Sequence, residues 1–177
     1  GVGAGITEIR VQEVFNYALY DQSDVVRQII GFGGPMDETP LMLFDVSLEM
    51  VWAPMVRVLA DMLGLTLDDV RIQVERRPLE RTVEVPGMGT FEAGTQGAFR
   101  FEVQGVVGGR PLLVVEHITR IDDDCAPDWQ QSTSPGGEHR VRRFELDQHQ
   151  LALADRLDLE PGRQRGEHRF LRRIGHD

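Results

Sequence analysis

The stretch Phe99-Arg100-Phe101-Glu102-Val103-Gln104 decides the fold, because it alternates apolar and polar residues with the period of a half-buried β-strand. The pair Gly108-Gly109 follows, and two successive glycines favour a tight hairpin turn in which both residues adopt positive φ. The return stretch, residues 112–120, reads Leu-Leu-Val-Val-Glu-His-Ile-Thr-Arg. Together these segments predict a β-hairpin over residues 98–120.

Continuous pairing from that turn sets Phe101 opposite Glu116, and cross-strand partners share a face of the sheet. We therefore expect Glu116 in the apolar face and His117 on the other face, beside Arg100. A buried carboxylate must be paired, hydrogen-bonded or neutral. Glu116 is accordingly either a member of a structural ion pair or part of a site.

A second acidic residue shows the same anomaly near the N-terminus. Residues 6–15 alternate as a strand, and Glu13 falls on the face of Ile9, Val11 and Phe15. If Glu13 and Glu116 share a sheet face, they could line one acidic recess with a cation between them. That cation would be Arg120, which shares the face of Glu116, or a bound amine. The alternative is a structural Glu–Arg bridge at a sheet end.

Two further side chains are candidates for the site. His117 could act as a general acid or base, the alternative being a half-exposed structural histidine. Tyr17 follows the first strand on a loop, where binding residues often occur, the alternative being packing at the rim.

The rest of the chain predicts an α+β fold. Helices are expected over residues 24–30, stopped by Gly31, and over 52–63, with Gly64 just beyond the C-cap. The apolar residues of the second helix wrap most of its surface, so we expect it to be largely buried. Further strands are expected at 70–75 and 81–85. The helices should cover one face of a mainly antiparallel or mixed sheet.

Composition narrows the function classes. The chain has 177 residues and a net charge of −10, which argues against nucleic-acid binding. It has no apolar run long enough to span a membrane. One cysteine, Cys125, excludes an internal disulfide and a cysteine-rich metal site, and it suits the reducing cytoplasm. All 19 basic residues are arginine, which excludes chemistry that needs a lysine.

Charge divides the chain into two parts. Residues 1–138 hold 10 Arg and 22 acidic residues, whereas residues 139–177 hold 9 Arg and 7 acidic residues. This shift predicts a boundary near residue 138.

Several stretches, in order and spacing, are similar to the C-terminal domain of 2,4-diaminopentanoate dehydrogenase-like proteins. This family includes NAD(P)H-dependent amine dehydrogenases and proteins labelled dihydrodipicolinate reductase. The similar stretches are residues 10–17, Gly31-Phe32-Gly33, residues 53–61, 100–102, 108–111 and 115–120, and Ala126-Pro127-Asp128-Trp129. The resemblance covers roughly residues 6 to 142. It stops near Arg142, which implies one domain over residues 1–142 and a divergent, frame-shifted or disordered tail over residues 143–177.

The resemblance implies a substrate-binding and oligomerisation domain, with the fold of the dihydrodipicolinate reductase-like C-terminal domain. In this family an N-terminal Rossmann domain, missing from this chain, binds NAD or NADP. The implied whole is a homo-oligomeric oxidoreductase acting on a small amine or amino-acid-like substrate, and the chain alone should be inactive. Glu116 and His117 would be catalytic, and Glu13, Tyr17 and Arg120 would bind substrate. The His-His-x-x-Lys pattern of authentic dihydrodipicolinate reductases is absent. The alternative is a stand-alone small-ligand-binding or dimerisation module without a cofactor.

Overall fold

The computed structural model describes residues 7–20, 22–132 and 138–144, and in these residues the fold is α+β. The main sheet has five strands in the order β2-β5-β6-β1-β7. Their bounds are β1 Glu8–Asn16, β2 Asp69–Pro78, β5 Gln96–Val107, β6 Arg110–Arg120 and β7 Glu138–Phe144. Strand β1 runs parallel to β6, and the other neighbours are antiparallel, so the sheet is mixed.

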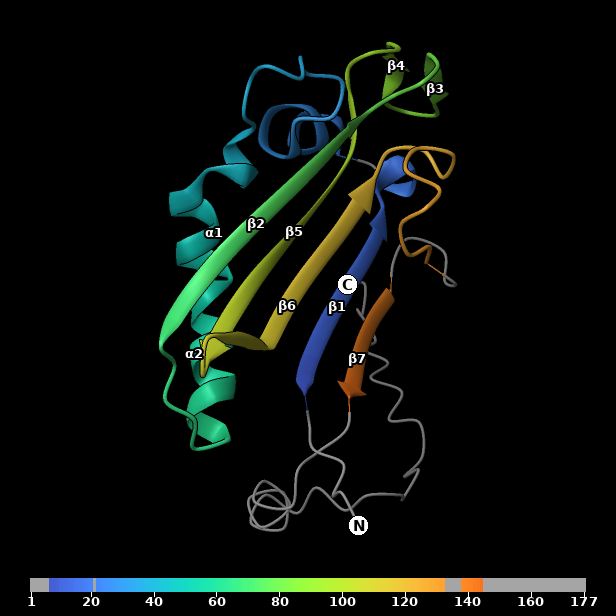
Figure 1. Ribbon diagram of the computed structural model, residues 1–177. Helices are drawn as coiled ribbons and strands as arrows, with labels where there is room; N and C mark the ends of the chain where they lie inside the picture. The colour runs from blue at the N-terminus through green and yellow to red at the C-terminus, as the bar shows by residue number, and fades with distance from the viewer. Residues whose placement is uncertain (1–6, 21, 133–137, 145–177) are drawn as a thin grey trace, which may run out of the picture.

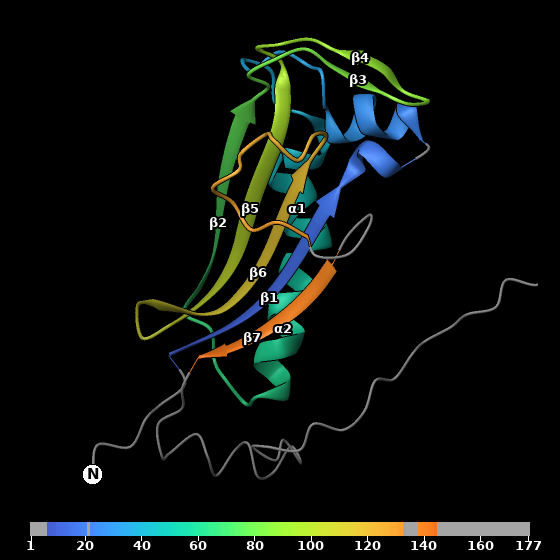
Figure 2. The ribbon, with the colours of Figure 1, turned by 90° about the vertical axis from the view of Figure 1, so that its right-hand side faces the viewer.

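The helical segments cover one face of this sheet, as the sequence predicts (Figures 1 and 2). They are η2 Val25–Ile30, α1 Asp45–Val51 and α2 Ala53–Met62, with the short turns η1 Tyr17–Leu19 and η3 Leu41–Leu43. The short strands β3 Val83–Val85 and β4 Gly89–Phe91 form a separate ribbon at one end of the molecule. We call the helix-bearing side of the sheet the covered face and the other side the open face.

Local sequence signals explain the ends of the helices. Gly31 closes η2 in the left-handed region at φ 85°, and a Cβ there would lie 2.4 Å from Pro40 Cβ. Pro54 lies in the first turn of α2, where its missing N–H costs nothing. Leu63 is the C-cap of α2, and Gly64 follows at φ 64°. These predicted ends are confirmed.

The predicted burial of the second helix is wrong. Only one side of α2, Ala53, Val56 and Ala60, is buried, whereas Val58 is 56% exposed and Met62 60% exposed. A helix lying on a sheet has a single packing partner, so apolar residues on its far side stay at the surface. Helix α1 lacked a sequence prediction, and it also leaves apolar residues at the surface, with Met50 73% and Val51 55% exposed.

The hairpin forms with the predicted turn but with a different register. Gly108 and Gly109 both have positive φ, 60° and 78°. Next to the turn Val107 pairs with Arg110 and Val106 with Pro111, as continuous pairing requires. The next pair is Gly105 with Leu113, so Leu112 is an extra residue in β6, a β-bulge. Beyond it every pair is shifted by one residue.

The shift reverses the faces of the two hairpin residues singled out by the sequence. Phe101 lies opposite His117, and Glu102 lies opposite Glu116. The prediction that Glu116 occupies the apolar face, with His117 on the other, is therefore wrong. The physical reason is the period of two, because a one-residue shift moves each side chain to the opposite side of the sheet.

Strand β7 pairs antiparallel with β1 at one edge of the sheet and was not expected from the sequence. It spans the predicted boundary at residue 142. The predictions for the tail beyond Phe144 concern residues 145–177, which lie outside the described residues. None of the helices in the described residues is long and apolar enough to cross a membrane.

Candidate active site

His117 lies in the interior, on the covered face of β6, with 3% of its surface exposed. Aromatic rings enclose it: Phe101 stacks with a centroid separation of 5.1 Å and Phe99 with 6.0 Å. Phe15 and Trp52 approach at tilted angles, at 5.8 and 6.1 Å. The alternative of a half-exposed structural histidine is therefore wrong, and the sequence did not predict Trp52 as a neighbour.

One nitrogen of this imidazole is paired and the other is not. Nδ1 lies 3.1 Å from Oε2 of Glu13, whose side chain is 26% exposed. Nε2 has no hydrogen-bond partner within the described part of the chain. A carboxylate at Nδ1 holds a proton on that nitrogen, so neutral His117 presents Nε2 as an acceptor and charged His117 presents it as a donor. The pair can therefore hydrogen-bond a polar group that enters the aromatic surroundings.

Parallel pairing of β1 with β6 creates this contact, because it sets Glu13 beside His117. The predicted face of Glu13, shared with Ile9, Val11 and Phe15, agrees with this register. The predicted acidic recess of Glu13 and Glu116 is wrong, since Gln12 and not Glu13 pairs with Glu116. The two carboxylates lie on opposite faces of the sheet.

Tyr17 joins the same neighbourhood directly after β1. Its ring contacts those of Phe15, Tyr20 and Phe32, with centroids 6.0, 5.3 and 6.0 Å away. Burial raises the pKa of the Tyr17 phenol, and Tyr20 and Glu13 add to the effect. The structure thus brings together three of the five predicted site residues: Glu13, Tyr17 and His117.

Thr119 is a site candidate that sequence reasoning missed. It lies two residues beyond His117 in β6, so it shares the covered face. Its side chain is fully buried, and its hydroxyl has no hydrogen-bond partner among the described residues. The available signal was its spacing from His117, because residues two apart on a strand share a face of the sheet.

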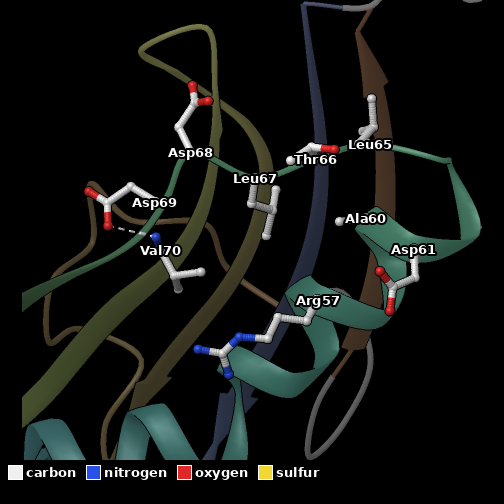
Figure 3. A pocket seen from close by; sticks show the side chains of 9 residues that line it. All are labelled: Arg57, Ala60, Asp61, Leu65, Thr66, Leu67, Asp68, Asp69 and Val70. Atoms are coloured by element: carbon white, nitrogen blue, oxygen red, sulfur yellow. Dashed lines mark hydrogen bonds between the residues drawn. The ribbon is translucent and has the colours of Figure 1, made fainter.

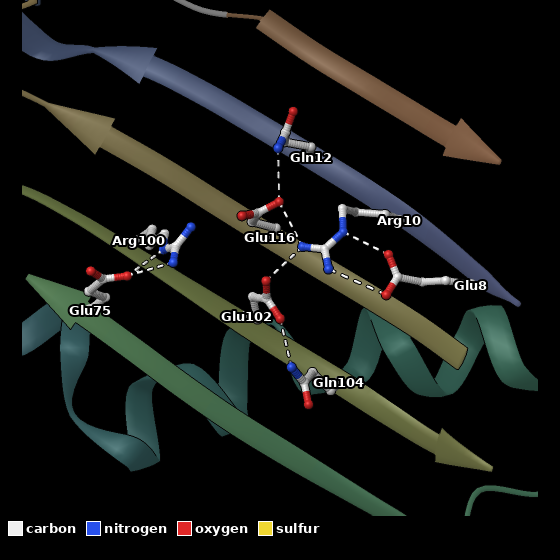
Figure 4. A network of polar contacts seen from close by, with 8 residues as sticks. All are labelled: Glu8, Arg10, Gln12, Glu75, Arg100, Glu102, Gln104 and Glu116. Carbon is white, nitrogen blue, oxygen red and sulfur yellow. Dashed lines mark hydrogen bonds and ion pairs between the residues drawn. The ribbon is translucent and has the colours of Figure 1, made fainter. Parts of the chain in front are cut away.

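Glu116 belongs instead to an ion-pair network on the open face (Figure 4). Arg10 Nη1 donates to Glu116 Oε2 at 2.8 Å and to Glu102 Oε1 at 2.7 Å. Gln12 Nε2 donates to the same Glu116 oxygen at 2.8 Å. The buried carboxylate is therefore charge-paired and hydrogen-bonded.

Arg10 is the central cation of this network, and its Nε also donates to Glu8 Oε1 at 2.8 Å. Burial alone would lower the pKa of Arg10, but hydrogen bonds to three carboxylates outweigh it and raise the pKa. Burial likewise opposes ionisation of Glu102, yet hydrogen bonds from Arg10 and Gln104 lower the pKa of Glu102. The open-face network thus favours the charged forms of Arg10 and Glu102.

Arg120 does not fill the role that the sequence suggested. It shares the open face with Glu116, as predicted, but no ion pair links the two among the described residues. Arg120 is 1% exposed, and its Nη2 donates to the Gln130 carbonyl at 2.9 Å. Its Nε and Nη1 have no partner in the described part of the chain, and burial lowers its pKa.

Two surface clefts do not have His117 among their lining residues. The first, of about 460 Å³, lies between the end of α2 and the start of β2 and is lined by Arg57, Asp61 and Asp68 among others (Figure 3). The second, of about 260 Å³, is lined by residues of β2 and β5 including Glu75 and Arg100. In the described residues no group of three or more His, Cys, Asp or Glu side chains is placed to hold a metal ion.

Comparisons with known proteins relate the chain to amine dehydrogenases. It is 51% identical over 142 residues to a protein from Streptomyces virginiae named amine dehydrogenase. The match covers 80% of this chain and 39% of that protein, so the chain spans about two-fifths of the length of its curated relative. No family model matches the chain.

A solved amine dehydrogenase from Mycobacterium smegmatis has a similar fold, with a TM-score of 0.50. That comparison covers 89% of this chain and 48% of the solved chain, at 11% sequence identity. At this identity the likeness concerns the fold alone. It agrees with the mixed α+β architecture described above.

Proposed function

We propose that this chain is the substrate-side domain of an NAD- or NADP-dependent oxidoreductase that acts on an amine or amino-acid-like substrate. The observation that carries the proposal is the 51% identity over 142 residues to an amine dehydrogenase. The buried Glu13–His117 pair supports it, because a half-paired imidazole in an aromatic enclosure is suited to binding a polar group on an otherwise apolar ligand.

The proposed division of labour places the cofactor on a part of the enzyme outside this chain. The described residues contain no Gly-x-Gly-x-x-Gly turn between a strand and a helix, which a dinucleotide-binding unit would use. The nicotinamide would exchange a hydride with the substrate carbon that bears nitrogen. The residues of this chain would hold that carbon in position.

Each residue of the site has a distinct proposed role. His117 Nε2 hydrogen-bonds the polar group of the substrate, and Glu13 orients the imidazole and adds negative charge for a cationic amine. Tyr17 and the rings of Phe15 and Trp52 exclude water from the apolar part of the ligand. Glu116 and Arg120, on the open face, act on the site only through the strands that they stabilise.

A fusion protein tests this proposal. The part of the Streptomyces virginiae relative that this chain does not match is joined to the chain, and NAD(P)H formation is measured with a series of small amines. We expect activity with the fusion and none with the chain alone. A folded fusion without activity, beside an active parent enzyme, would contradict the proposal.

Variants of the fusion separate chemistry from folding. His117→Phe preserves the stacked ring and removes both nitrogens, so the melting temperature should hold or rise while kcat/KM falls by at least about tenfold, the loss expected for one hydrogen bond to a charged group. Glu13→Gln should raise KM for cationic amines more than for neutral ones. As a matched control, Glu116→Gln should lower the melting temperature with little change in kcat/KM, and the reverse pattern would move the site to the open face.

A further inference from the structure

Strand β2 ends the sheet with a long, regular and unpaired edge. It is ten residues long, and its register with β5 is uninterrupted from Asp69 to Arg77. No described strand pairs with its outer side, which faces outward at one side of the molecule (Figure 1). Edge strands of this length attract another strand unless charges or irregularities prevent it.

The charged residues of β2 would face residues of opposite charge if two copies of the strand paired antiparallel. The open-face residues of β2, in order, are Asp69, Arg71, Gln73, Glu75 and Arg77. If a second copy is laid antiparallel with Gln73 opposite Gln73, Asp69 faces Arg77 of the second copy and Arg71 faces Glu75 of the second copy. Opposite charges that face each other across two strands stabilise the pairing.

On the covered face the same register joins the central apolar residues, and Arg76, which hydrogen-bonds Gln96 and the Met36 carbonyl of its own chain, lies opposite Val70. Ile72 of each copy would lie opposite Val74 of the other, and Val74 is 42% exposed in the single chain. The pairing would therefore remove apolar surface that is exposed without it.

Neighbouring registers lack this fit. Moving the pairing by two residues sets Asp69 opposite Glu75, or Arg71 opposite Arg77 in the other direction. Moving it by one residue sets Arg71 opposite Val74, or opposite Arg76 in the other direction, so both the Asp69–Arg77 and the Arg71–Glu75 pairs are lost. Like charges directly opposite each other are destabilising, so the pairing centred on Gln73 is the favoured one.

From this pattern we propose that two copies of the chain associate through β2, antiparallel about a two-fold axis at Gln73. The two sheets then become one continuous sheet with all helices on the same side, which is a closed, isologous interface. Each charge keeps its existing partner within the strand, Asp69 with Arg71 at 3.2 Å and Glu75 with Arg77, and gains a further one from the second copy. The interface is independent of the proposed enzymatic activity.

Cysteine cross-linking of the full chain tests the axis. In Gln73→Cys the two introduced thiols lie directly opposite each other, within the Cα separation that a disulfide bridges. In the control Arg71→Cys they lie four residues apart along the strands, about 13 Å. Cys125 does not interfere, because it is buried and burial raises its thiol pKa to about 11. Mild oxidation should give a covalent dimer with Gln73→Cys and at least about tenfold less with Arg71→Cys; equal or absent cross-linking in both would overturn the proposal.

Charge reversal tests the register by sedimentation velocity. Arg71→Glu and Glu75→Arg each set two like-charged pairs across the axis, and each should raise the dimer dissociation constant by roughly tenfold or more. An equimolar mixture of the two variants should restore association, because both pairs across the axis of the mixed dimer again join opposite charges. Arg110→Glu is the control, because it changes the net charge by the same amount as Arg71→Glu but lies at the exposed hairpin turn. It should leave the dimer intact.

Two results would overturn the proposed interface outright. One is a monomeric wild-type chain at about 100 μM, well above the concentration at which a specific interface forms. The other is a dimer equally sensitive to Arg110→Glu and Arg71→Glu. If Glu75→Arg fails to fold because Glu75 also binds Arg100 at 2.6 Å, Arg71→Glu and the cross-link decide the question.

Discussion

Arg10 contacts three carboxylates at once, those of Glu8, Glu102 and Glu116. Sequence reasoning expected an arginine near Glu116 but selected Arg120 from the same strand. Arg10 lies more than a hundred residues away in sequence, and parallel pairing of β1 with β6 brings it alongside. A residue's partner in a sheet depends on which strands become neighbours, and a local pattern does not encode that choice.

Replacing Arg10 tests the weight of this network. Arg10→Met leaves Glu116, whose side chain is 5% exposed, without its cation. The free energy of unfolding should fall by about 3 kcal/mol at pH 7, as expected when one member of a buried pair is removed. Urea denaturation measures the change. Arg81→Met is the control, because the Arg81 side chain is 55% exposed and its ion pairs are screened by water, so its loss should change the free energy of unfolding much less.

The same variant gives a pH dependence with a definite sign. The pKa of Glu102 is lowered from 4.5 in the folded chain. Its ion pair therefore contributes stability above about pH 4.5, and this contribution is lost as pH falls through the folded pKa. In wild type the free energy of unfolding should drop on acidification below pH 4.5, and Arg10→Met should lack this part of the drop. Parallel curves for both proteins would contradict the assignment.

At the scale of elements, the bulge in β6 determines what each face of the sheet presents. Leu112 is the extra residue, and beyond it His117 faces the helices and Glu116 faces the open side. The alternation of the hairpin sequence is compatible with pairing either with or without this extra residue, since side chains alternate between the two faces in both cases. Bulges of this kind are set by the fit of the whole sheet and are difficult to read from one strand.

Deleting Leu112 tests the role of the bulge. Pairing would then continue from the turn without a shift and would carry Glu116 into the aromatic core and His117 to the open face. Because this buries a carboxylate away from Arg10, we expect loss of the cooperative thermal transition monitored by near-UV circular dichroism. Leu112→Val keeps the extra residue and should retain the transition. A native-like transition in the deletion variant would show that the strand re-forms the bulge elsewhere.

The contact between α2 and the sheet depends on a glycine in β5. A Cβ at Gly105 would lie 2.6 Å from Val56 Cγ1 and 3.1 Å from Leu67 Cδ2. Gly105→Ala should therefore lower the free energy of unfolding by about 1–3 kcal/mol through overpacking. Thermal denaturation measures this loss. Gly105→Ala should cost less stability in a Val56→Ala background than in wild type, because the shortened side chain leaves room for the added methyl group. Simple additivity of the two changes would contradict close packing here.

At the scale of the whole molecule, the chain corresponds to part of a longer relative, of which it matches 39%. Its described residues form a five-stranded sheet with helices on one face and a two-stranded ribbon at one end. The proposed activity needs a second unit to bind the cofactor. The exposed apolar residues of α1 and α2, Met50, Val58 and Met62, lie on the surface away from the sheet.

Cofactor binding tests this division at the molecular scale. The purified chain should show no measurable heat on titration with NADPH or NADH in isothermal calorimetry, because the described residues lack a dinucleotide-binding turn. The fusion proposed above should bind one of them and serves as the positive control. Micromolar binding to the chain alone would contradict the assignment of the cofactor to another domain.

The sequence by itself determined the features that depend on neighbouring residues. It located the hairpin and its Gly108-Gly109 turn, the caps at Gly31 and Gly64, the face of Glu13 in the first strand and the α+β class. Each of these follows from local steric preferences or from a short hydrophobic period, which a few adjacent residues are enough to express.

Only the tertiary structure decided which residues form the candidate site. The Glu13–His117 pair requires both the parallel pairing of β1 with β6 and the one-residue shift at Leu112. Both are properties of strands far apart in sequence, settled by the packing of the whole sheet against its helices. Because the side-chain period of a strand is two, the shift of one residue in register places His117 among the aromatic rings and Glu116 in the ion-pair network. Without the shift each residue would lie on the opposite face.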